Sequence, residues 1–248
     1  MWDDARQLDA LAKGLAVLAV TLLLWGALAW AARQAPFAFR EVVVRGALNE
    51  VSAAHLEAVV RDELAGTFFT MNLEAARASL VRVPWVRNIA LRRQWPQRLE
   101  VTVEEQVPYA RWNDTGLVNT FGEVFVADYN GDLPQFAGPD GRAAEVADRY
   151  RESSEALSPL GLTVQVVRLS ARGGWHVTAK GGNGALAIEL GREEPSARLA
   201  RFVAAYERTI GALARAGTRI DHVDLRYRNG FAARVPGFRE RPLKKAAA

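Results

Sequence analysis

The side chains that could carry out chemistry in this chain are few and widely separated. There are three histidines, His55, His176 and His222. None has a second histidine or a carboxylate at the spacing of a metal site, such as the helical H-E-x-x-H pattern. His176 and His222 alternate with apolar residues, which is typical of the solvent face of a strand. We interpret all three as surface residues and expect no metal site.

The sequence indicates no catalytic nucleophile, no pair of catalytic carboxylates and no phosphate-binding loop either. The chain has no cysteine, which excludes disulfides, thiolate zinc sites and a cysteine nucleophile. Ser153 and Ser154 are not part of a G-x-S-x-G elbow. Glu104 and Glu105 are neighbours in a predicted strand and therefore point to opposite faces. The Gly-Gly-Asn-Gly run at residues 181–184 joins two predicted strands and opens no helix, which favours a turn. We expect no catalytic residue, no cofactor and no enzyme.

Composition restricts the class of protein. The chain has 248 residues and a net charge of +4, with 32 basic and 28 acidic residues. These charges are dispersed along the sequence, whereas a nucleic-acid-binding surface gathers them into a patch. The length is sufficient for two small domains, each with its own core. We therefore expect no nucleic acid and no small-molecule substrate.

One stretch near the N-terminus divides the chain. Residues 14–32 contain no charge, and a helix of that length spans roughly 28 Å, close to the apolar thickness of a bilayer. Lys13 and Arg33 close its two ends, and Trp30 lies where an indole prefers the far interface. The pattern predicts a single transmembrane helix that follows a short tail at residues 1–13.

Two other interpretations of this stretch have to be weighed. A buried core helix is disfavoured because the stretch is apolar on all sides. A cleaved signal peptide is suggested by the small-x-small run Ala29-Trp30-Ala31, but Asp3, Asp4 and Asp9 dilute the positive charge that precedes it. The flanking charges do not determine an orientation.

The region after the span begins with a compact pattern. A linker at residues 33–38 precedes a strand at 39–45, helices at 51–65 and 73–83, and strands at 85–93 and 98–106. This order predicts a small sheet with two helices on one face.

A second pattern follows Pro108. We expect a hairpin at residues 117–126, a loop at 131–141, a helix at 143–160, strands at 162–169, 175–180 and 185–190, one long helix capped by Ser196, and a strand at 219–227. Asn229-Gly230 is a signal for a type I′ hairpin turn, so residues 231–235 should pair back as the last strand. An edge strand there could accept a partner strand, with Tyr227 and Phe231 as side-chain anchors. Equally, both could be core residues beside a solvated edge.

Several motifs, taken together, resemble the FtsQ/DivIB family of bacterial cell-division proteins. They run in the same order over almost the whole chain: FREVVVRG at 39–46, VPWV at 83–86, QWP at 94–96, VPYARWND at 107–114, LP at 133–134, GP at 138–139, RLARF at 198–202 and VDLRY at 223–227. The resemblance implies an α+β protein with a single N-terminal transmembrane helix. A POTRA domain (β-α-α-β-β) at residues 39–107 would follow, then a mixed α/β domain with an antiparallel sheet at 108–236 and a disordered tail at 237–248.

The resemblance also implies a function, a location and partners. The chain would be a single-pass protein of the inner membrane at the division septum, with a cytoplasmic N-terminus and periplasmic domains. It would be a scaffold of the divisome that binds FtsB, and with it FtsL, by strand addition, while the POTRA part engages other divisome proteins. The partner-binding residues would be Arg172, Arg226, Tyr227, Asn229, Gly230, Phe231, Ala232, Ala233, Arg234 and Val235.

Two functions of other classes are alternatives. The first is a POTRA-containing component of secretion or outer-membrane assembly, which predicts further repeats that the sequence lacks. The second is a periplasmic enzyme released by signal cleavage, which would need the catalytic set that is missing above.

Overall fold

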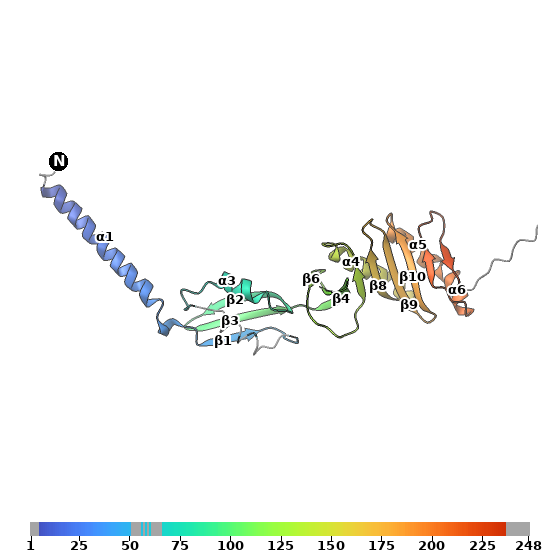
Figure 1. The fold of residues 1–248 in the computed structure, drawn as a ribbon, viewed down its shortest axis with the longest axis horizontal. Coiled ribbons are helices and arrows are strands. Elements are labelled where there is room, and N and C mark those ends of the chain that lie inside the picture. The colour runs from blue at the N-terminus through green and yellow to red at the C-terminus, as the bar shows by residue number, and fades with distance from the viewer. Residues whose placement is uncertain (1–4, 51–55, 57, 59, 61–65, 237–248) are drawn as a thin grey trace, which may run out of the picture. The chain divides into compact units, whose positions relative to one another are not determined.

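The computed structural model describes residues 5–50, 56, 58, 60 and 66–236. The chain divides into two compact units, Met1–Gln106 and Val107–Ala248 (Figure 1). The helix expected at residues 51–65 lies largely outside the described residues, as does the tail at 237–248.

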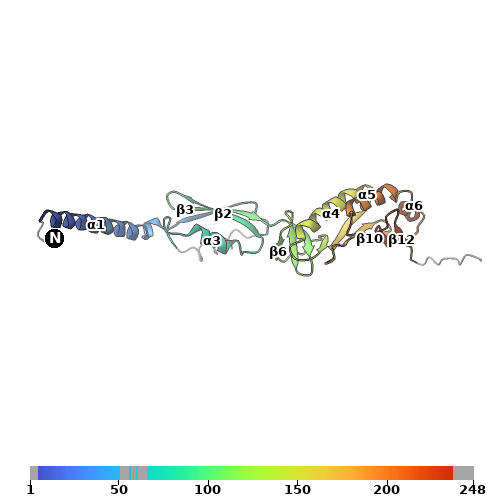
Figure 2. The same ribbon diagram turned by 90° about the horizontal axis from the view of Figure 1, so that it is seen from above.

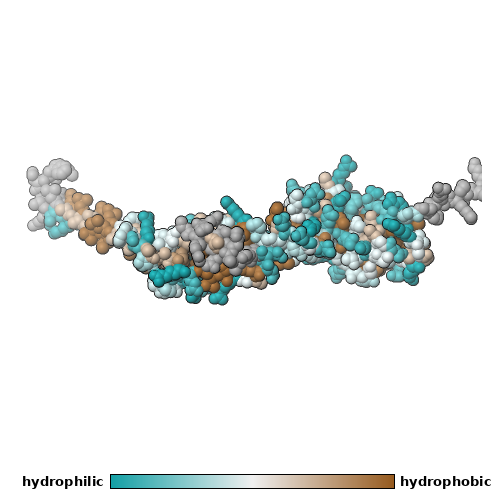
Figure 3. All heavy atoms as spheres, turned by 60° about the horizontal axis from the view of Figure 1, so that its bottom comes forward, coloured by the Kyte–Doolittle hydropathy of each residue, from teal (hydrophilic) through white to brown (hydrophobic). Residues whose placement is uncertain are grey.

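The first unit begins with a long helix, α1 (Ala5–Ala31). Its segment Asp9–Ala31 has a mean hydropathy of 2.0 over its most apolar window, and none of that window is buried inside the protein. On the face drawn in Figure 3, apolar residues follow one another along α1. The Thr21 hydroxyl donates to the Val17 carbonyl oxygen at 2.8 Å, so the one hydroxyl of the apolar run is satisfied within the helix. The helix is long and apolar enough to cross a membrane and fits a single-pass membrane protein.

A three-stranded sheet with α3 (Leu73–Leu80) follows. The strands are β1 (Glu41–Arg45), β2 (Val86–Gln94) and β3 (Arg98–Glu105), in the spatial order β1-β3-β2. The central strand β3 pairs in parallel with β1 and antiparallel with β2. This is the sheet that the sequence predicts for the POTRA domain.

Local sequence explains both the sheet and its helix. In β3, Leu99, Val101 and Val103 are buried and alternate with more exposed residues, so one face of the strand forms the core. The helix α3 begins where the Asn72 side chain accepts hydrogen bonds from two backbone N–H groups at 3.1 Å, which is the arrangement of an asparagine N-cap. It buries Leu80 against the same core.

The second unit contains a nine-stranded sheet. Its strands are β4 (Pro108–Trp112), β5 (Gly116–Asn119), β6 (Val124–Phe125), β7 (Gln135–Ala137), β8 (Thr163–Leu169), β9 (Trp175–Gly181), β10 (Gly184–Gly191), β11 (His222–Asp224) and β12 (Ala232–Arg234). The spatial order is β12-β11-β10-β9-β8-β7-β4-β5-β6. The sheet is mixed, since β4–β7, β7–β8 and β10–β11 are parallel pairs and the other pairs are antiparallel.

Helices cover one face of this sheet. They are α4 (Ala143–Leu157) with the short 3-10 turn η2 (Ser158–Leu160), α5 (Pro195–Tyr206) and α6 (Ile210–Arg215). Figure 2 shows α4 and α5 together on one side of the strands. A continuous core lies between the two layers and includes Phe136, Val167, Ile188 and Phe202.

The strand β7 corrects the loop expected at residues 131–141. Phe136 is completely buried, and its strand pairs in parallel with β4 on one side and β8 on the other. A strand of three residues is too short to show a periodicity of two, and Gly and Pro on both sides favour a loop in any local interpretation. Pairing with strands distant in sequence is what makes it a strand.

The single long helix expected after Ser196 is also corrected. The helix α5 begins at Pro195, preceded by Glu194 in a left-handed conformation (φ 46°), so Ser196 is not its N-cap. It ends at Tyr206, and the Thr209 hydroxyl donates to the Ala205 carbonyl oxygen at 2.8 Å before α6 begins. The apolar face of α5 continues across the break, because Ile210 at the start of α6 is buried in the same core.

Candidate partner-binding edge

The last strand, β12, lies at one edge of the nine-stranded sheet. Among the described residues it pairs only with β11, antiparallel, in the register His222↔Arg234, Val223↔Ala233 and Asp224↔Ala232. The predicted return of the chain after the last turn is therefore confirmed, in a strand of Ala232–Arg234 within the expected 231–235. All three of its residues are exposed.

The turn before β12 differs from the expected type I′ hairpin. That turn requires a positive φ at both central residues, and neither Asn229 nor Gly230 has one. The strand β11 ends at Asp224, so residues 225–231 form a longer loop. The Asn-Gly pair is located correctly, but its turn geometry differs from the predicted one, because the pairing of β11 with β12 stops at Asp224 and Ala232.

The free edge of β12 can be assigned to particular backbone groups. Ala187 N–H donates to the Asp221 carbonyl oxygen at 3.0 Å, and Leu225 N–H donates to the Glu189 carbonyl oxygen at 2.8 Å. Val223, which lies between these two residues in β11, therefore faces β10, whereas the Asp221 N–H, just before the strand, donates to the Arg234 carbonyl oxygen at 3.4 Å. Because hydrogen-bonding direction alternates along a strand, His222 and Asp224 face β12. Their partners Arg234 and Ala232 face back.

It follows that Ala233 directs its N–H and C=O away from the sheet. Its partner Val223 faces β10, and opposite residues of an antiparallel pair either both face each other or both face away. Within the part of the chain that the structure describes, no strand pairs with this side of β12. Ala233 therefore offers one donor and one acceptor to an incoming strand.

The two candidate anchors beside the turn have different surroundings. Tyr227 is 57% exposed. Phe231 is partly buried, packs against the main core and lies 5.5 Å from the ring of Phe202 in an edge-to-face arrangement. Val235 also packs partly against that core. Tyr227 is therefore a surface side chain, whereas Phe231 and Val235 hold β12 in place.

An ion pair joins the edge strand to its neighbour. The Arg234 guanidinium contacts both carboxylate oxygens of Asp221, at 2.9 and 3.1 Å. The hydrogen bond from Arg234 lowers the pKa of Asp221 and raises that of the guanidinium. This bidentate geometry positions the C-terminal end of β12.

A second bidentate pair lies at the start of the loop. Arg226 contacts the two carboxylate oxygens of Asp224 at 2.9 and 2.7 Å and lies 3.6 Å from Glu189. The hydrogen bond from Arg226 lowers the pKa of Asp224, and the same contact raises the pKa of Arg226. The Arg226 side chain is itself exposed, so it orders the loop and still presents positive charge to solvent.

A groove of about 460 Å³ lies beside the same loop. Its lining residues are Arg198, Arg201, Phe202, Ala205, Leu225, Arg228, Asn229, Gly230 and Phe231. Three of them are arginines and two are aromatic. The sequence did not indicate Arg198 or Arg201 as site residues, because α5 and the loop meet only in the folded chain.

Arg172 lies at the same end of the sheet. It is exposed in the turn between β8 and β9, where Gly173 N–H donates to the Ser170 carbonyl oxygen at 2.9 Å. The register pairs Trp175 with Gly191 and Glu189 with Asp224, so this turn and the loop that carries Arg226 extend beyond the same ends of the strands. The structure thereby brings Arg172 to the sheet end where the other arginines lie.

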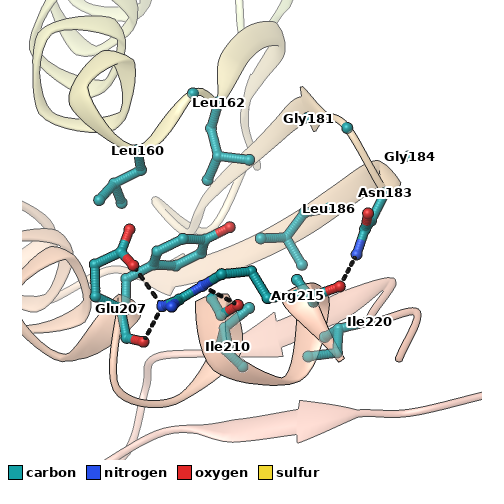
Figure 4. A pocket seen from close by; sticks show the side chains of 15 residues that line it. Leu160, Leu162, Gly181, Asn183, Gly184, Leu186, Glu207, Ile210, Arg215 and Ile220 are labelled. Carbon is teal, nitrogen blue, oxygen red and sulfur yellow. Dashed lines mark hydrogen bonds and ion pairs between the residues drawn. The ribbon is translucent and has the colours of Figure 1, made fainter. Parts of the chain in front are cut away.

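Another cavity, of about 490 Å³, lies between the Gly181–Gly184 turn and α6 (Figure 4). Its polar groups are committed to structural contacts: Arg215 contacts Glu207 at 2.7 Å, and the Asn183 amide donates to the Ala214 carbonyl oxygen at 2.7 Å. The run at residues 181–184 is a turn between β9 and β10, as expected. Among the described residues, no group of three or more His, Cys, Asp or Glu side chains could hold a metal ion.

One histidine has a partner that the sequence did not indicate. His176 Nδ1 lies 3.1 Å from a carboxylate oxygen of Glu189. The two residues are opposite each other on β9 and β10. Their proximity depends on strand register, which spacing along the sequence does not reveal.

Comparison with known proteins agrees with this architecture. Residues 37–106 match the POTRA domain, FtsQ-type, and residues 110–226 match the family described as cell division protein FtsQ/DivIB, C-terminal. The chain is 39% identical over 246 residues to cell division protein FtsQ of Burkholderia pseudomallei, covering 96% of each chain. It is 38% identical to FtsQ of Nitrosospira multiformis, covering 94% of this chain and 99% of the relative. The chain therefore belongs to the FtsQ/DivIB family of cell division proteins.

Proposed function

We propose that this chain is a non-enzymatic scaffold of the divisome, anchored in the inner membrane by α1. Residues 1–13 would lie in the cytoplasm, and both folded units would lie in the periplasm at the septum. Membership of the family and the apolar helix α1 support this proposal. The periplasmic partners would be FtsB, together with FtsL, and other divisome proteins would meet the POTRA unit.

The observation that carries the proposal is the free edge of β12. Its backbone N–H and C=O at Ala233 face away from the sheet, and its exposed side chains are small at Ala232 and Ala233. An extended segment of FtsB would add there as a further strand, gaining main-chain hydrogen bonds from this edge. The core contacts of Phe231 and Val235 keep the edge ordered before the partner arrives, which reduces the entropic cost of binding.

The side chains around this edge suggest the chemistry of the added segment. The exposed Tyr227 ring provides an apolar anchor of the kind that dominates interface energetics. Arg226 and Arg172, at the same end of the sheet, favour a segment with acidic residues. A strand of FtsB that carries acidic and apolar side chains is thus the expected complement of this surface.

The test is the affinity of the full-length chain for FtsB after Tyr227→Ala. We expect the dissociation constant to rise at least about tenfold, as for a truncated aromatic hot spot. A charge at Phe231 is a poorer test, since that ring contacts Phe202 in the core and the change would also weaken the fold.

Phe121→Ala is the matched control. Phe121 is 60% exposed, close to the exposure of Tyr227, and follows β5 near the opposite edge of the same sheet. This variant should bind FtsB normally. Equal affinity of the Tyr227 and Phe121 variants, with both chains folded by circular dichroism, would rule out the β12 site.

A further inference from the structure

The POTRA unit carries an exposed aromatic cluster at the end where α1 joins it. Phe37, Phe68, Phe69 and Trp95 form this cluster, which we call the aromatic end. Ring centroids are 5.2 Å apart for Phe37–Phe69, 5.3 Å for Phe68–Phe69 and 5.7 Å for Phe68–Trp95, each in an edge-to-face arrangement. Three separate segments of the chain supply these rings, so the cluster is a product of the fold.

Two of the four rings at this end lie largely outside the core. Phe69 is 53% exposed and Trp95 is 70% exposed. Among the described residues after α1 in this unit, Val81 is the only other large apolar residue that is exposed, and its exposed fraction is lower, at 39%. Exposed apolar groups concentrated at one place in a small domain mark an interaction surface.

Hydrogen bonds attach this end to the chain that leaves α1. The Thr67 hydroxyl donates to the Ala32 carbonyl oxygen at 2.5 Å, and Phe68 N–H donates to the Phe37 carbonyl oxygen at 2.7 Å. The Gln97 side-chain amide donates to the Pro36 carbonyl oxygen. The segment between the helix and the sheet is therefore folded onto the aromatic end.

The tether places this end within reach of the bilayer surface. The helix α1 ends at Ala31, and the short helix that contains Phe37 starts at Ala35. Six residues span at most roughly 20 Å even when extended, and the headgroup layer begins where the apolar span stops. Trp30 is exposed in the last turn of α1, and in a membrane-spanning α1 it would lie at the interfacial position that indole rings prefer.

The charges nearby suit the same environment. Arg33 and Arg40 are exposed, and neither has a carboxylate at ion-pair distance among residues 5–50 and 66–236. Basic side chains beside aromatic rings bind the headgroup region, where the cations meet lipid phosphates and the rings meet the acyl boundary.

We propose that the aromatic end of the POTRA unit inserts into the headgroup layer of the membrane that α1 spans. The occupant of this surface is the phospholipid bilayer itself. Docking there would hold the POTRA unit against the membrane and limit its rotation about the anchor. This proposal depends on the membrane anchor but is independent of FtsB and of the β12 edge.

The absence of cysteine allows a direct depth measurement in the full-length chain. A nitroxide at Phe69→Cys is compared with one at Val81→Cys, after reconstitution into phosphatidylethanolamine–phosphatidylglycerol vesicles that contain no other protein. Electron paramagnetic resonance then reports collisions with oxygen, which concentrates in lipid, and with a water-soluble nickel chelate.

We expect the label at position 69 to have a several-fold higher ratio of oxygen to nickel collisions than the label at position 81. Adding Trp95→Asp to the Phe69→Cys chain should reduce that ratio towards the value at position 81. Because the Trp95 side chain is mostly exposed, this change should leave the circular dichroism spectrum unaltered.

Three outcomes would overturn the proposal. Equal ratios at the two positions would show that the aromatic end lies in water, where it could bind a protein but does not contact lipid. Dipolar broadening between labels at position 69 in dilute vesicles would assign the surface to a second copy of the chain. A ratio unchanged by Trp95→Asp would show that the tether alone, without the cluster, brings the label to the membrane.

Discussion

The outward-facing backbone of Ala233 allows a sharper test of strand addition than any side-chain change. Replacing Ala233 by proline removes one N–H group. That group faces away from β11, so the β11–β12 ladder keeps its hydrogen bonds. Proline is tolerated at an edge strand when its missing N–H is on the open side. The fold should therefore survive while one donor to the partner is lost.

The expected loss of affinity follows from that single donor. A net hydrogen bond contributes about 0.5–1.5 kcal/mol, and a partner carbonyl left unsatisfied in the interface costs about 1–3 kcal/mol more. Together these amount to about 1.5–4.5 kcal/mol, or roughly a 10- to 2,000-fold higher dissociation constant for FtsB. Isothermal titration calorimetry of the full-length chain with FtsB measures this directly.

Two matched variants complete this test. Ala233→Val keeps the N–H and suits a strand, so its affinity should stay near that of the original chain. Ala232→Pro removes an N–H that faces β11 and should detach β12, raising hydrogen exchange in β11 as well as abolishing binding. If Ala233→Pro is folded and binds FtsB as well as Ala233→Val does, strand addition at this edge is refuted.

Two further predictions concern the fold of the second unit. Phe136→Ala should destabilise that unit by about 3–5 kcal/mol in urea unfolding, because the completely buried ring lies on the strand that joins both halves of the sheet; a change below about 1 kcal/mol would contradict a core strand at β7. The lowered pKa of Asp224 means that its pair with Arg226 stabilises the fold above the unfolded carboxyl pKa of about 3.9, and that this contribution is lost as the pH falls through the native pKa. Asp224→Asn should therefore lower the urea midpoint more at pH 7 than at pH values below the native pKa of Asp224, and an equal effect in both ranges would refute the linkage.

Local pattern predicted the elements that are long or strongly signalled. The alternation in β3, the Asn72 cap of α3 and the β9–β10 turn at residues 181–184 all follow from interactions among near neighbours in sequence. The sequence pattern does not predict the break after Tyr206. The buried apolar face of α5 continues in α6, so the helical periodicity is the same with and without the break.

Runs of neighbouring residues are enough to predict the long apolar helix near the N-terminus, the order of the two folded regions and the absence of local catalytic patterns. They also locate the last strand. Only the tertiary structure decided which backbone groups of that strand are free, because the direction of Ala233 depends on β10 and β11. The aromatic end likewise joins Phe37, Phe69 and Trp95 from three distant segments. No local periodicity records such contacts, which arise only when the sheet brings those segments to the same place.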